Sequence, residues 1–266
     1  MTEYSASAIP QVADMFRLDG KVAVITGGGS GIGRLAAHVL SQVGASSIVT
    51  DRDGDRAAEV AAEIRNAGGH ASSYHMDVAD ESSVVSTFAE IEAAQSRIDV
   101  LIGCAGISIR AQTEDLTLED WEKVVAVNQT GIFLASREAG KRMLAQGEGS
   151  IVNISSKWGH VAGPFNGNLS YHATKAAVVN MTRALAVEWG NRGVRVNDIA
   201  PTFLRTAMTE HLFTQQGFVE QAMDLLPLRR TGVPADLAGA LLYLASPASA
   251  LVTGHSLVVD GGWTAR

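Results

Sequence analysis

The chain has 266 residues, of which 46% are hydrophobic and 18% charged, a composition typical of a folded globular protein. Its 21 Lys and Arg are outnumbered by 28 Asp and Glu, and the formal charge of −7 argues against partners such as nucleic acid or an anionic membrane surface. A single cysteine excludes an internal disulfide and a thiolate zinc site. The histidines form neither HxxxH nor HExxH, so we expect no catalytic metal.

The N-terminal residues and the longest apolar run indicate where in the cell the protein is expected. That run, residues 237–245, is far shorter than the roughly 20 residues of a membrane-spanning helix. Residues 1–14 have neither a basic n-region nor an apolar h-region, so no signal peptide is expected. We therefore expect a cytoplasmic protein in which residues 1–17 form a peripheral N-terminal arm.

From about residue 21 onward, short segments rich in β-branched residues alternate with longer segments of helical periodicity. This alternation is typical of repeated βαβ units and a parallel sheet. The predicted strands are residues 21–26, 46–50, 72–76, 99–103, 150–154, 194–199 and 256–259.

The first predicted helix shows the clearest apolar face. Counted from Ile32, apolar residues fall at offsets 0, 3, 4, 7, 8 and 11, and Gly44 follows as an end signal. No repeat, linker or low-complexity tract interrupts the rest of the chain, so we predict one domain over residues 18–266. Residues 203–228 are less regular, and we interpret them as a substrate loop.

A glycine-rich turn, Thr26-Gly-Gly-Gly-Ser-Gly-Ile-Gly33, joins the first strand to this helix. Glycines permit positive φ and let backbone N–H groups approach a pyrophosphate at the positive end of a helix. No Lys-Ser/Thr follows, which argues against a P-loop. The turn therefore predicts a dinucleotide site.

Asp51 ends the second strand, 18 residues after Gly33. That is close to the roughly 20 residues expected for the acid that binds a ribose 2′-hydroxyl, and a carboxylate there repels a 2′-phosphate. Ser30 and Thr50 offer no cation to such a phosphate, although Arg52 could. NAD is therefore the predicted cofactor, with NADP the less favoured alternative. A helix-capping role for Asp51 is compatible with this interpretation.

Tyr171 and Lys175 are four residues apart in a predicted helix, so their side chains share one face. A nearby ammonium lowers the pKa of a phenol. A tyrosine tuned in this way can act as a general acid/base in the interconversion of an alcohol and a carbonyl.

Taken with the glycine turn, these motifs resemble those of the classical short-chain dehydrogenase/reductase family over residues 18–264. The matches, in chain order, are Thr26-Gly27-x-x-x-Gly31-x-Gly33, Asp77-Val78, Ala105-Gly106, Asn128, Ser155-Ser156, Tyr171-x-x-x-Lys175, Pro201 with Thr206, and Thr253-Gly254 with Val259-Asp260-Gly261-Gly262.

The resemblance implies an α/β fold, a single-domain Rossmann-type doubly wound parallel sheet of about seven strands, assembled as a homotetramer. It also implies NAD-dependent oxidation of a secondary alcohol, with a polyol, sugar or sugar acid as the expected class, or reduction of the matching ketone. One alternative is an NADPH-dependent 3-oxoacyl-[acyl carrier protein] reductase. Another is a catalytically idle protein that senses nucleotide.

The catalytic group implied by the resemblance is Asn128, Ser156, Tyr171 and Lys175. Of the two adjacent serines, Ser156 is chosen because the family motif places it three residues before Gly159, which leaves Ser155 a packing role. Tyr171 exchanges the substrate proton and Ser156 donates to the substrate oxygen. Lys175 lowers the tyrosine pKa and binds the nicotinamide ribose, and Asn128 holds a water of the proton path.

Two positions depart from the family pattern, Cys104 in place of asparagine and Thr202 in place of glycine. The loop between Gly159 and Tyr171 also looks about two residues longer than usual. The expected cofactor contacts are Gly27, Ser30, Gly31, Ile32, Gly33, Asp51, Arg52, Asp77, Val78, Cys104, Ala105, Gly106, Tyr171, Lys175, Pro201, Leu204 and Thr206. The expected substrate contacts are Ser156, Trp158, His160, Phe165, Asn166, Tyr171 and Phe203, with a core or subunit-interface role left open for Trp158 and Phe165.

Overall fold

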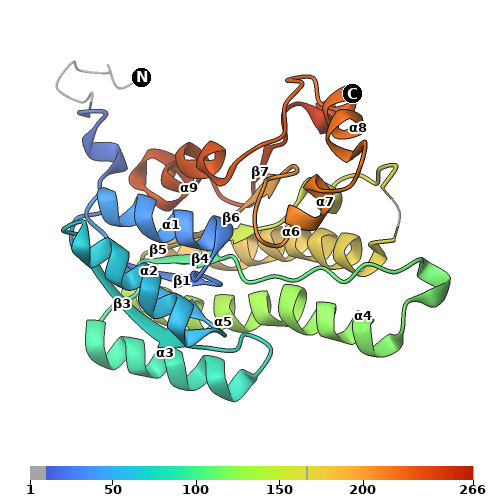
Figure 1. Cartoon of the computed structure of the whole chain (residues 1–266). Coiled ribbons are helices and arrows are strands. Elements are labelled where there is room, and N and C mark those ends of the chain that lie inside the picture. The colour runs from blue at the N-terminus through green and yellow to red at the C-terminus, as the bar shows by residue number, and fades with distance from the viewer. Residues whose placement is uncertain (1–9, 166, 266) are drawn as a thin grey trace.

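A central sheet with helices on both faces makes up the computed structural model, which describes residues 10–165 and 167–265 (Figure 1). Residues 1–9 of the predicted arm, and Asn166 of the predicted substrate contacts, lie outside the described residues.

The sheet has seven strands, all parallel, in the order β3-β2-β1-β4-β5-β6-β7. This confirms the predicted fold, and each strand begins and ends within two residues of its predicted range. β1, β4 and most of β5 and β6 are buried on both faces, which explains the nearly continuous apolar sequence of β1 and β4. The strands are β1 (Val22–Thr26), β2 (Ser46–Asp51), β3 (His70–His75), β4 (Val100–Gly103), β5 (Gly149–Ile154), β6 (Val194–Pro201) and β7 (Ser256–Val259).

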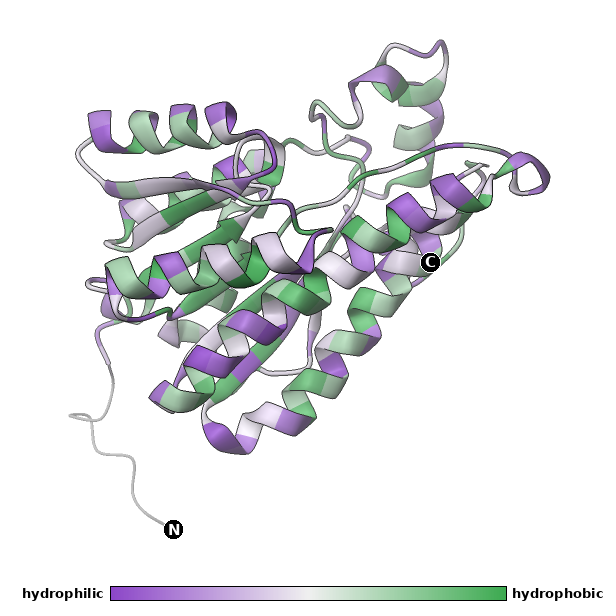
Figure 2. Cartoon of the chain, turned by 90° about the horizontal axis from the view of Figure 1, so that it is seen from below, coloured by the Kyte–Doolittle hydropathy of each residue, from purple (hydrophilic) through white to green (hydrophobic). Residues whose placement is uncertain are grey.

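Helices pack on the two faces of the sheet through two separate hydrophobic clusters. One cluster joins the sheet to α1, α2 and α9, and the other joins it to α3, α5 and α6. Figure 2 shows helices on which hydrophobic and hydrophilic residues alternate, over strands that are mainly hydrophobic. The helices are α1 (Gly31–Gln42), α2 (Gly54–Asn66), α3 (Glu81–Gln95), α4 (Leu118–Val125), α5 (Gly131–Gln146), α6 (Leu169–Trp189), α7 (Glu210–Phe213), α8 (Phe218–Leu225) and α9 (Ala238–Ala245).

α1 follows the predicted periodicity and buries Ala36, Ala37 and Leu40 on its inner face. It ends at Gln42, just before Gly44, whose φ of 101° lies in the region that favours glycine. None of the helices in the described parts of the chain is long and apolar enough to cross a membrane.

The strand order reverses between β1 and β4, and in open α/β sheets ligands bind at such a point, outside the carboxyl ends of the strands. The predicted loop 203–228 is more ordered than expected, because it contains α7 and α8. These two helices and the C-terminal residues gather at the same end of the molecule (Figure 1).

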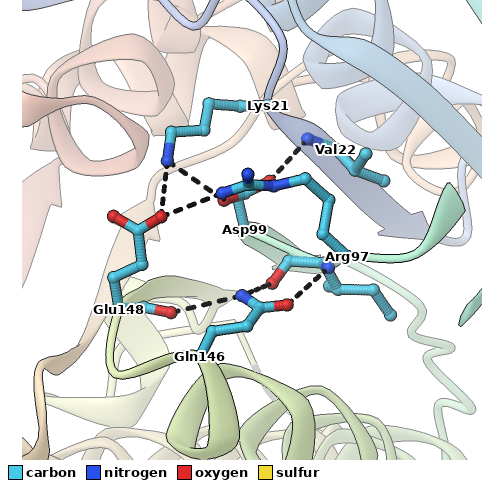
Figure 3. A network of polar contacts seen from close by, with 7 residues as sticks. Lys21, Val22, Arg97, Asp99, Gln146 and Glu148 are labelled. Atoms are coloured by element: carbon cyan, nitrogen blue, oxygen red, sulfur yellow. Dashed lines mark hydrogen bonds and ion pairs between the residues drawn. The ribbon is translucent and has the colours of Figure 1, made fainter.

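The opposite end of the sheet is held by a polar network centred on Asp99 (Figure 3). The Asp99 carboxylate accepts hydrogen bonds from the Val22 N–H at 2.9 Å, Lys21 Nζ at 3.2 Å and Arg97 Nε at 2.7 Å. The Glu148 carboxylate accepts hydrogen bonds through Oε1 from Lys21 Nζ at 2.7 Å and from Arg97 Nη2 at 2.9 Å. The segments that lead into β1, β4 and β5 are thereby joined.

Replacing Asp99 with Asn is expected to lower the free energy of unfolding by about 1–3 kcal/mol, because the 5% exposed side chain loses charge-assisted hydrogen bonds. Burial raises the pKa of the Asp99 carboxyl, but hydrogen bonds from Arg97, Val22 and Lys21 outweigh that effect and hold the pKa below 3.8. This contribution is present above the unfolded pKa and is lost as the pH falls through the folded pKa. Urea titrations at pH 7 and pH 3 measure both effects.

Asp19→Asn is the matched control, since Asp19 pairs with Arg17 on an exposed surface where an ion pair contributes little. Equal losses in the two variants would contradict a stabilising role for the Asp99 network.

Candidate active site

The glycine turn is closed too tightly to accept side chains at two positions. A Cβ on Gly27, whose φ is +63°, would lie 2.8 Å from the Ala105 Cα, and a Cβ on Gly33 would lie 2.2 Å from the Gly27 carbonyl oxygen. Ser30 precedes α1 and its side chain makes no capping hydrogen bond. The first N–H groups of α1 are therefore free of a side-chain cap, as an anion site at a helix N-terminus requires.

Asp51 faces this turn from the end of β2. Its carboxylate accepts the N–H of Gly29 at 2.9 Å through Oδ2 and that of Asp53 at 2.9 Å through Oδ1. The two bonds fix the carboxylate at the edge of the cleft. Arg52 and Arg56 line the same edge, so cations stand beside the acid.

A cleft of about 600 Å³ runs along the carboxyl edge of the sheet. A Cβ on Gly31 would come 3.6 Å from the Thr206 methyl group, so the turn and the start of the substrate loop stand close together. Of the predicted cofactor contacts, all but Gly33 line the cleft: Gly27, Ser30, Gly31, Ile32, Asp51, Arg52, Asp77, Val78, Cys104, Ala105, Gly106, Tyr171, Lys175, Pro201, Leu204 and Thr206.

Three of the four predicted catalytic residues open into this cleft, namely Ser156, Tyr171 and Lys175. Ser156 follows β5, and its Oγ accepts the N–H of Trp158 at 3.2 Å. Lys175 is 3% exposed on α6, donates from Nζ to the Ile154 carbonyl at 2.6 Å, and lies 5.5 Å from the centre of the Tyr171 ring. The residues expected to act together are thus brought together.

Burial dominates the pKa values of Tyr171 and Lys175, and the lowering of the Tyr171 pKa by Lys175 stays a prediction. Burial raises the pKa of Tyr171 to about 12, and a hydrogen bond with Ser156 only partly opposes that shift. Burial also lowers the pKa of Lys175 to about 8. The physical reason is that both groups lose solvent, while the Lys175 ammonium is directed at the Ile154 carbonyl rather than at the phenol oxygen.

Asn128 is fully buried and does not line the cleft directly. It lies in a π-helical turn, Ala126–Thr130, between α4 and α5, and such turns are frequent at functional sites. Its Oδ1 accepts the Ile107 N–H at 2.8 Å, and its Nδ2 donates to the Ile107 carbonyl at 2.9 Å. Asn128 therefore holds the loop after β4 against the cleft.

The two adjacent serines point in different directions. The Ser155 hydroxyl donates to the buried Asp198 carboxyl and to the Ile199 carbonyl, the latter at 3.1 Å. Burial raises the pKa of Asp198. Ser155 is thus engaged in the core between β5 and β6, which supports the choice of Ser156 as the serine that faces a substrate.

Four of the predicted substrate contacts lie outside the described lining of the cleft: Trp158, His160, Phe165 and Phe203. Phe203 packs edge-on against Trp158 and Phe165, with ring centres 5.9 and 5.2 Å apart, in a hydrophobic cluster with Trp263 and Phe218. His160 is exposed and its Nε2 lies 2.8 Å from the Ser256 hydroxyl. Direct substrate contact by these four residues stays a prediction.

The departures from the family pattern are accommodated locally. The N–H groups of Cys104 and Ala105 both donate to the Thr26 hydroxyl, at 3.0 and 3.2 Å, which ties the end of β4 to the end of β1. Burial raises the pKa of the Cys104 thiol to about 12, so it is not a nucleophile. Thr202 lines the cleft and continues the β6 pairing through its N–H bond to the Val259 carbonyl.

Several cleft residues were missed from sequence, among them Ile107, Ser108, Thr202 and His211. Ile107 and Ser108 follow β4 at the carboxyl edge, so their position after a central strand was a usable signal. Ser108 also donates to the buried Asn168 at 3.1 Å, which joins this loop to the start of α6. His211 lies on the short helix α7, and nothing in the local sequence marks it.

Fold and cleft together define a Rossmann-type α/β protein with a Ser-Tyr-Lys group at the carboxyl edge of its sheet. A family model described as enoyl-(acyl carrier protein) reductase matches residues 27–264. The chain belongs to the classical short-chain dehydrogenase/reductase family, which confirms the resemblance found in its motifs.

Individual relatives are similar over almost the whole chain. D-threitol dehydrogenase of Mycolicibacterium smegmatis is 39% identical over 94% of this chain and 95% of its own. Galactitol 2-dehydrogenase (L-tagatose-forming) of Cereibacter sphaeroides is 41% identical over 94% and 97%. The crystal structure of a gluconate 5-dehydrogenase from Burkholderia cenocepacia in complex with NADP and tartrate has a TM-score of 0.93 at 35% identity, covering 96% of this chain and 100% of that one.

Proposed function

We propose that this protein is an NAD-dependent oxidoreductase that interconverts a secondary alcohol and its ketone. The observation that carries the proposal is that Ser156, Tyr171 and Lys175 open into the cleft that begins at the glycine turn. A dinucleotide whose pyrophosphate lies at that turn can extend along the cleft toward Tyr171. The residues present fit such a cofactor, because the first N–H groups of α1 have no side-chain cap and the glycines let the turn pack closely against β4 and α1.

The side chains divide the chemistry as follows. When bound, the nicotinamide supplies the hydride acceptor or donor. The Tyr171 hydroxyl gives its proton to a ketone oxygen, or takes one from an alcohol, as a general acid/base. The Ser156 hydroxyl donates to the same oxygen as charge develops there. Lys175 holds the nicotinamide ribose hydroxyls, and Asn128 holds the Ile107 loop and a water of the proton path.

The proposed substrate class is a polyol, sugar or sugar acid. Its support is the set of relatives, which are named for threitol, galactitol and gluconate. The test is to incubate the purified protein with these three compounds, each with NAD⁺ and with NADP⁺, and to follow the absorbance of the reduced nicotinamide. NADH formation with at least one compound is expected. A protein that binds NADH yet oxidises or reduces none of a broad alcohol and ketone panel would instead fit an idle nucleotide sensor.

The second candidate function is an NADPH-dependent 3-oxoacyl-[acyl carrier protein] reductase. A specific observation favours it, since Arg52 and Arg56 line the edge of the cleft where a 2′-phosphate would lie. Acetoacetyl-coenzyme A as substrate, with NADPH and NADH compared, separates the two functions. Faster turnover of this thioester with NADPH than of any polyol with NAD⁺ would reverse the preference.

Asp51→Ala is expected to lower the preference for NAD over NADP by about tenfold or more, the equivalent of about 1.4 kcal/mol, because the carboxylate that repels a 2′-phosphate is removed and the arginines remain. The measurement is the ratio of kcat/KM values for the two cofactors. Asp80→Ala is the matched control, since Asp80 caps α3 through the N–H of Ser82 and does not line the cleft. An unchanged ratio in Asp51→Ala would show that the acid does not face the ribose.

We also propose that the protein is a cytoplasmic homotetramer, as the family resemblance implies. The support is the family membership itself. Size-exclusion chromatography with light scattering gives the mass of the assembly, and a monomeric mass would contradict the proposal.

A further inference from the structure

Lys157 is a buried lysine next to the predicted catalytic serine, and the proposed chemistry does not use it. It is 1% exposed and lies in the 3₁₀ turn Lys157–Gly159 between Ser156 and Trp158. An ammonium without solvent is unfavourable unless other groups stabilise its charge. The surroundings of this side chain therefore need an explanation.

Three aromatic rings surround the Lys157 ammonium. Its Nζ lies 3.2 Å from the ring centre of Trp263, 3.7 Å from that of Phe203 and 4.5 Å from that of Trp158. The rings of these residues stand nearly edge-to-face, with interplanar angles of 72–83°. A desolvated cation over aromatic faces is stabilised by about 2 kcal/mol or more.

The rings come from three separate segments. Trp158 belongs to the turn after β5, Phe203 begins the substrate loop, and Trp263 lies in the C-terminal turn Trp263–Ala265. The Asp260 carboxylate holds that last turn by accepting the N–H groups of Gly262 and Thr264 at 2.8 and 2.7 Å. Lys157 is thus the one charged group, among the described residues, that all three aromatic segments contact.

Lys157 also reaches the cleft through one hydrogen bond. Its Nζ donates to the Thr202 hydroxyl at 3.1 Å, and Thr202 lines the cleft just before the substrate loop. Burial lowers the pKa of Lys157 to about 6, and Asp260 opposes that shift. The ring faces oppose it as well, because their quadrupoles attract only the charged form.

We propose that Lys157 is a positioning residue that holds the substrate loop and the C-terminal turn against the end of β5, next to Ser156. It does so through its contacts with the three rings, here called the aromatic cage, and through its hydrogen bond to Thr202. Because Lys157 contacts the loop and not the glycine turn, it affects the affinity for substrate, and its replacement leaves the affinity for the dinucleotide unchanged. The part of this inference that concerns substrate rests on the proposed function, whereas the fastening of the loop does not.

The experiment replaces Lys157 with Met, which keeps the length of the side chain and removes its charge. We expect KM for the alcohol to rise about tenfold, with kcat and the Kd for NADH within about twofold of wild type. We also expect trypsin to cut about fivefold faster after Arg205, Arg229 or Arg230, whose exposed side chains flank or lie in the loop, because cleavage follows local opening. Lys123→Met, an exposed lysine on α4, is the control and should change neither quantity.

Trp263 supplies the second pair of variants. Trp263→Phe keeps a ring face and should stay near wild type, whereas Trp263→Leu should accelerate cleavage as Lys157→Met does. The double variant Lys157→Met/Trp263→Leu should be no worse than either single change, because both remove the same contact. If Lys157→Met does not fold, as judged by circular dichroism, the difference in trypsin cleavage between Trp263→Phe and Trp263→Leu tests the proposal instead.

An ordinary core role for the lysine makes the opposite predictions. Replacing a buried charge with an apolar group of similar size is often neutral or stabilising. Wild-type KM and cleavage rates in Lys157→Met, or equal cleavage in the two Trp263 variants, would overturn the inference. If the wild type turns over no alcohol, the proposed function fails, and the cleavage rates still test whether the loop is fastened.

Discussion

Tyr171→Phe is expected to reduce turnover to less than about 1% of wild type, because a positioned general acid/base contributes about 10²- to 10⁴-fold. Only the hydroxyl is removed, and the ring that lies 5.5 Å from the Lys175 ammonium remains. The Kd for NADH, measured by fluorescence titration, should therefore stay within about twofold of wild type. A variant that keeps more than a few per cent of activity would show that another group moves the proton.

The raised pKa of Tyr171 predicts how the rates of oxidation and reduction depend on pH. At about 12, the phenol is protonated at neutral pH and ready to donate to a ketone. The oxidation of an alcohol needs the proton to leave, so its kcat/KM should rise with pH, while reduction should lose rate at alkaline pH. Profiles measured in both directions test this, and a reduction rate that increases with pH would contradict it.

Gly33→Ala is expected to weaken NADH binding by about 5- to 150-fold, the equivalent of about 1–3 kcal/mol of overpacking. The added Cβ would lie 2.2 Å from the Gly27 carbonyl oxygen and 3.0 Å from the Gly28 Cα, and a backbone cannot yield as a flexible side chain can. The turn must therefore open. The Kd for NADH from isothermal titration calorimetry is the measurement, with circular dichroism to verify that the variant is folded.

Gly239→Ala is the matched control, because a Cβ there meets nothing within 4 Å on α9. Alanine in a helix is also favoured over glycine by about 1 kcal/mol. This control should bind NADH as wild type does. Unchanged binding in Gly33→Ala would mean that the turn does not hold the dinucleotide.

The features that sequence predicts well here depend on local pattern. Most of the strands, such as β1, β2 and β7, are short segments rich in β-branched residues, and α1 has an apolar face that can be recognised without knowledge of its partners. The glycine turn is likewise recognisable, because positions such as Gly27 and Gly33 leave no room for a side chain. The spacing of Tyr171 and Lys175 places both on α6, as expected.

The features that sequence misses depend on tertiary contacts. Spacing alone does not reveal that the Lys175 ammonium is directed at the Ile154 carbonyl, nor that burial raises the pKa of Tyr171. The cage around Lys157 joins residues about 45 and 105 positions away in the chain, so no local window contains it. Trp158 and Phe203 are aromatic residues near the predicted catalytic serine, and only their packing places them in a hydrophobic cluster outside the lining of the cleft.

A crystal structure of the complex with NADH tests most directly whether the dinucleotide lies in the cleft with its nicotinamide next to Tyr171. It can be determined without knowing the substrate. We predict the pyrophosphate at the turn between β1 and α1, the adenine beside Asp77 and Val78, and C4 of the nicotinamide beside the Tyr171 and Ser156 hydroxyl groups, where a substrate carbon would come within hydride-transfer reach. A dinucleotide bound in the reverse direction, or with its nicotinamide far from Tyr171, would contradict it.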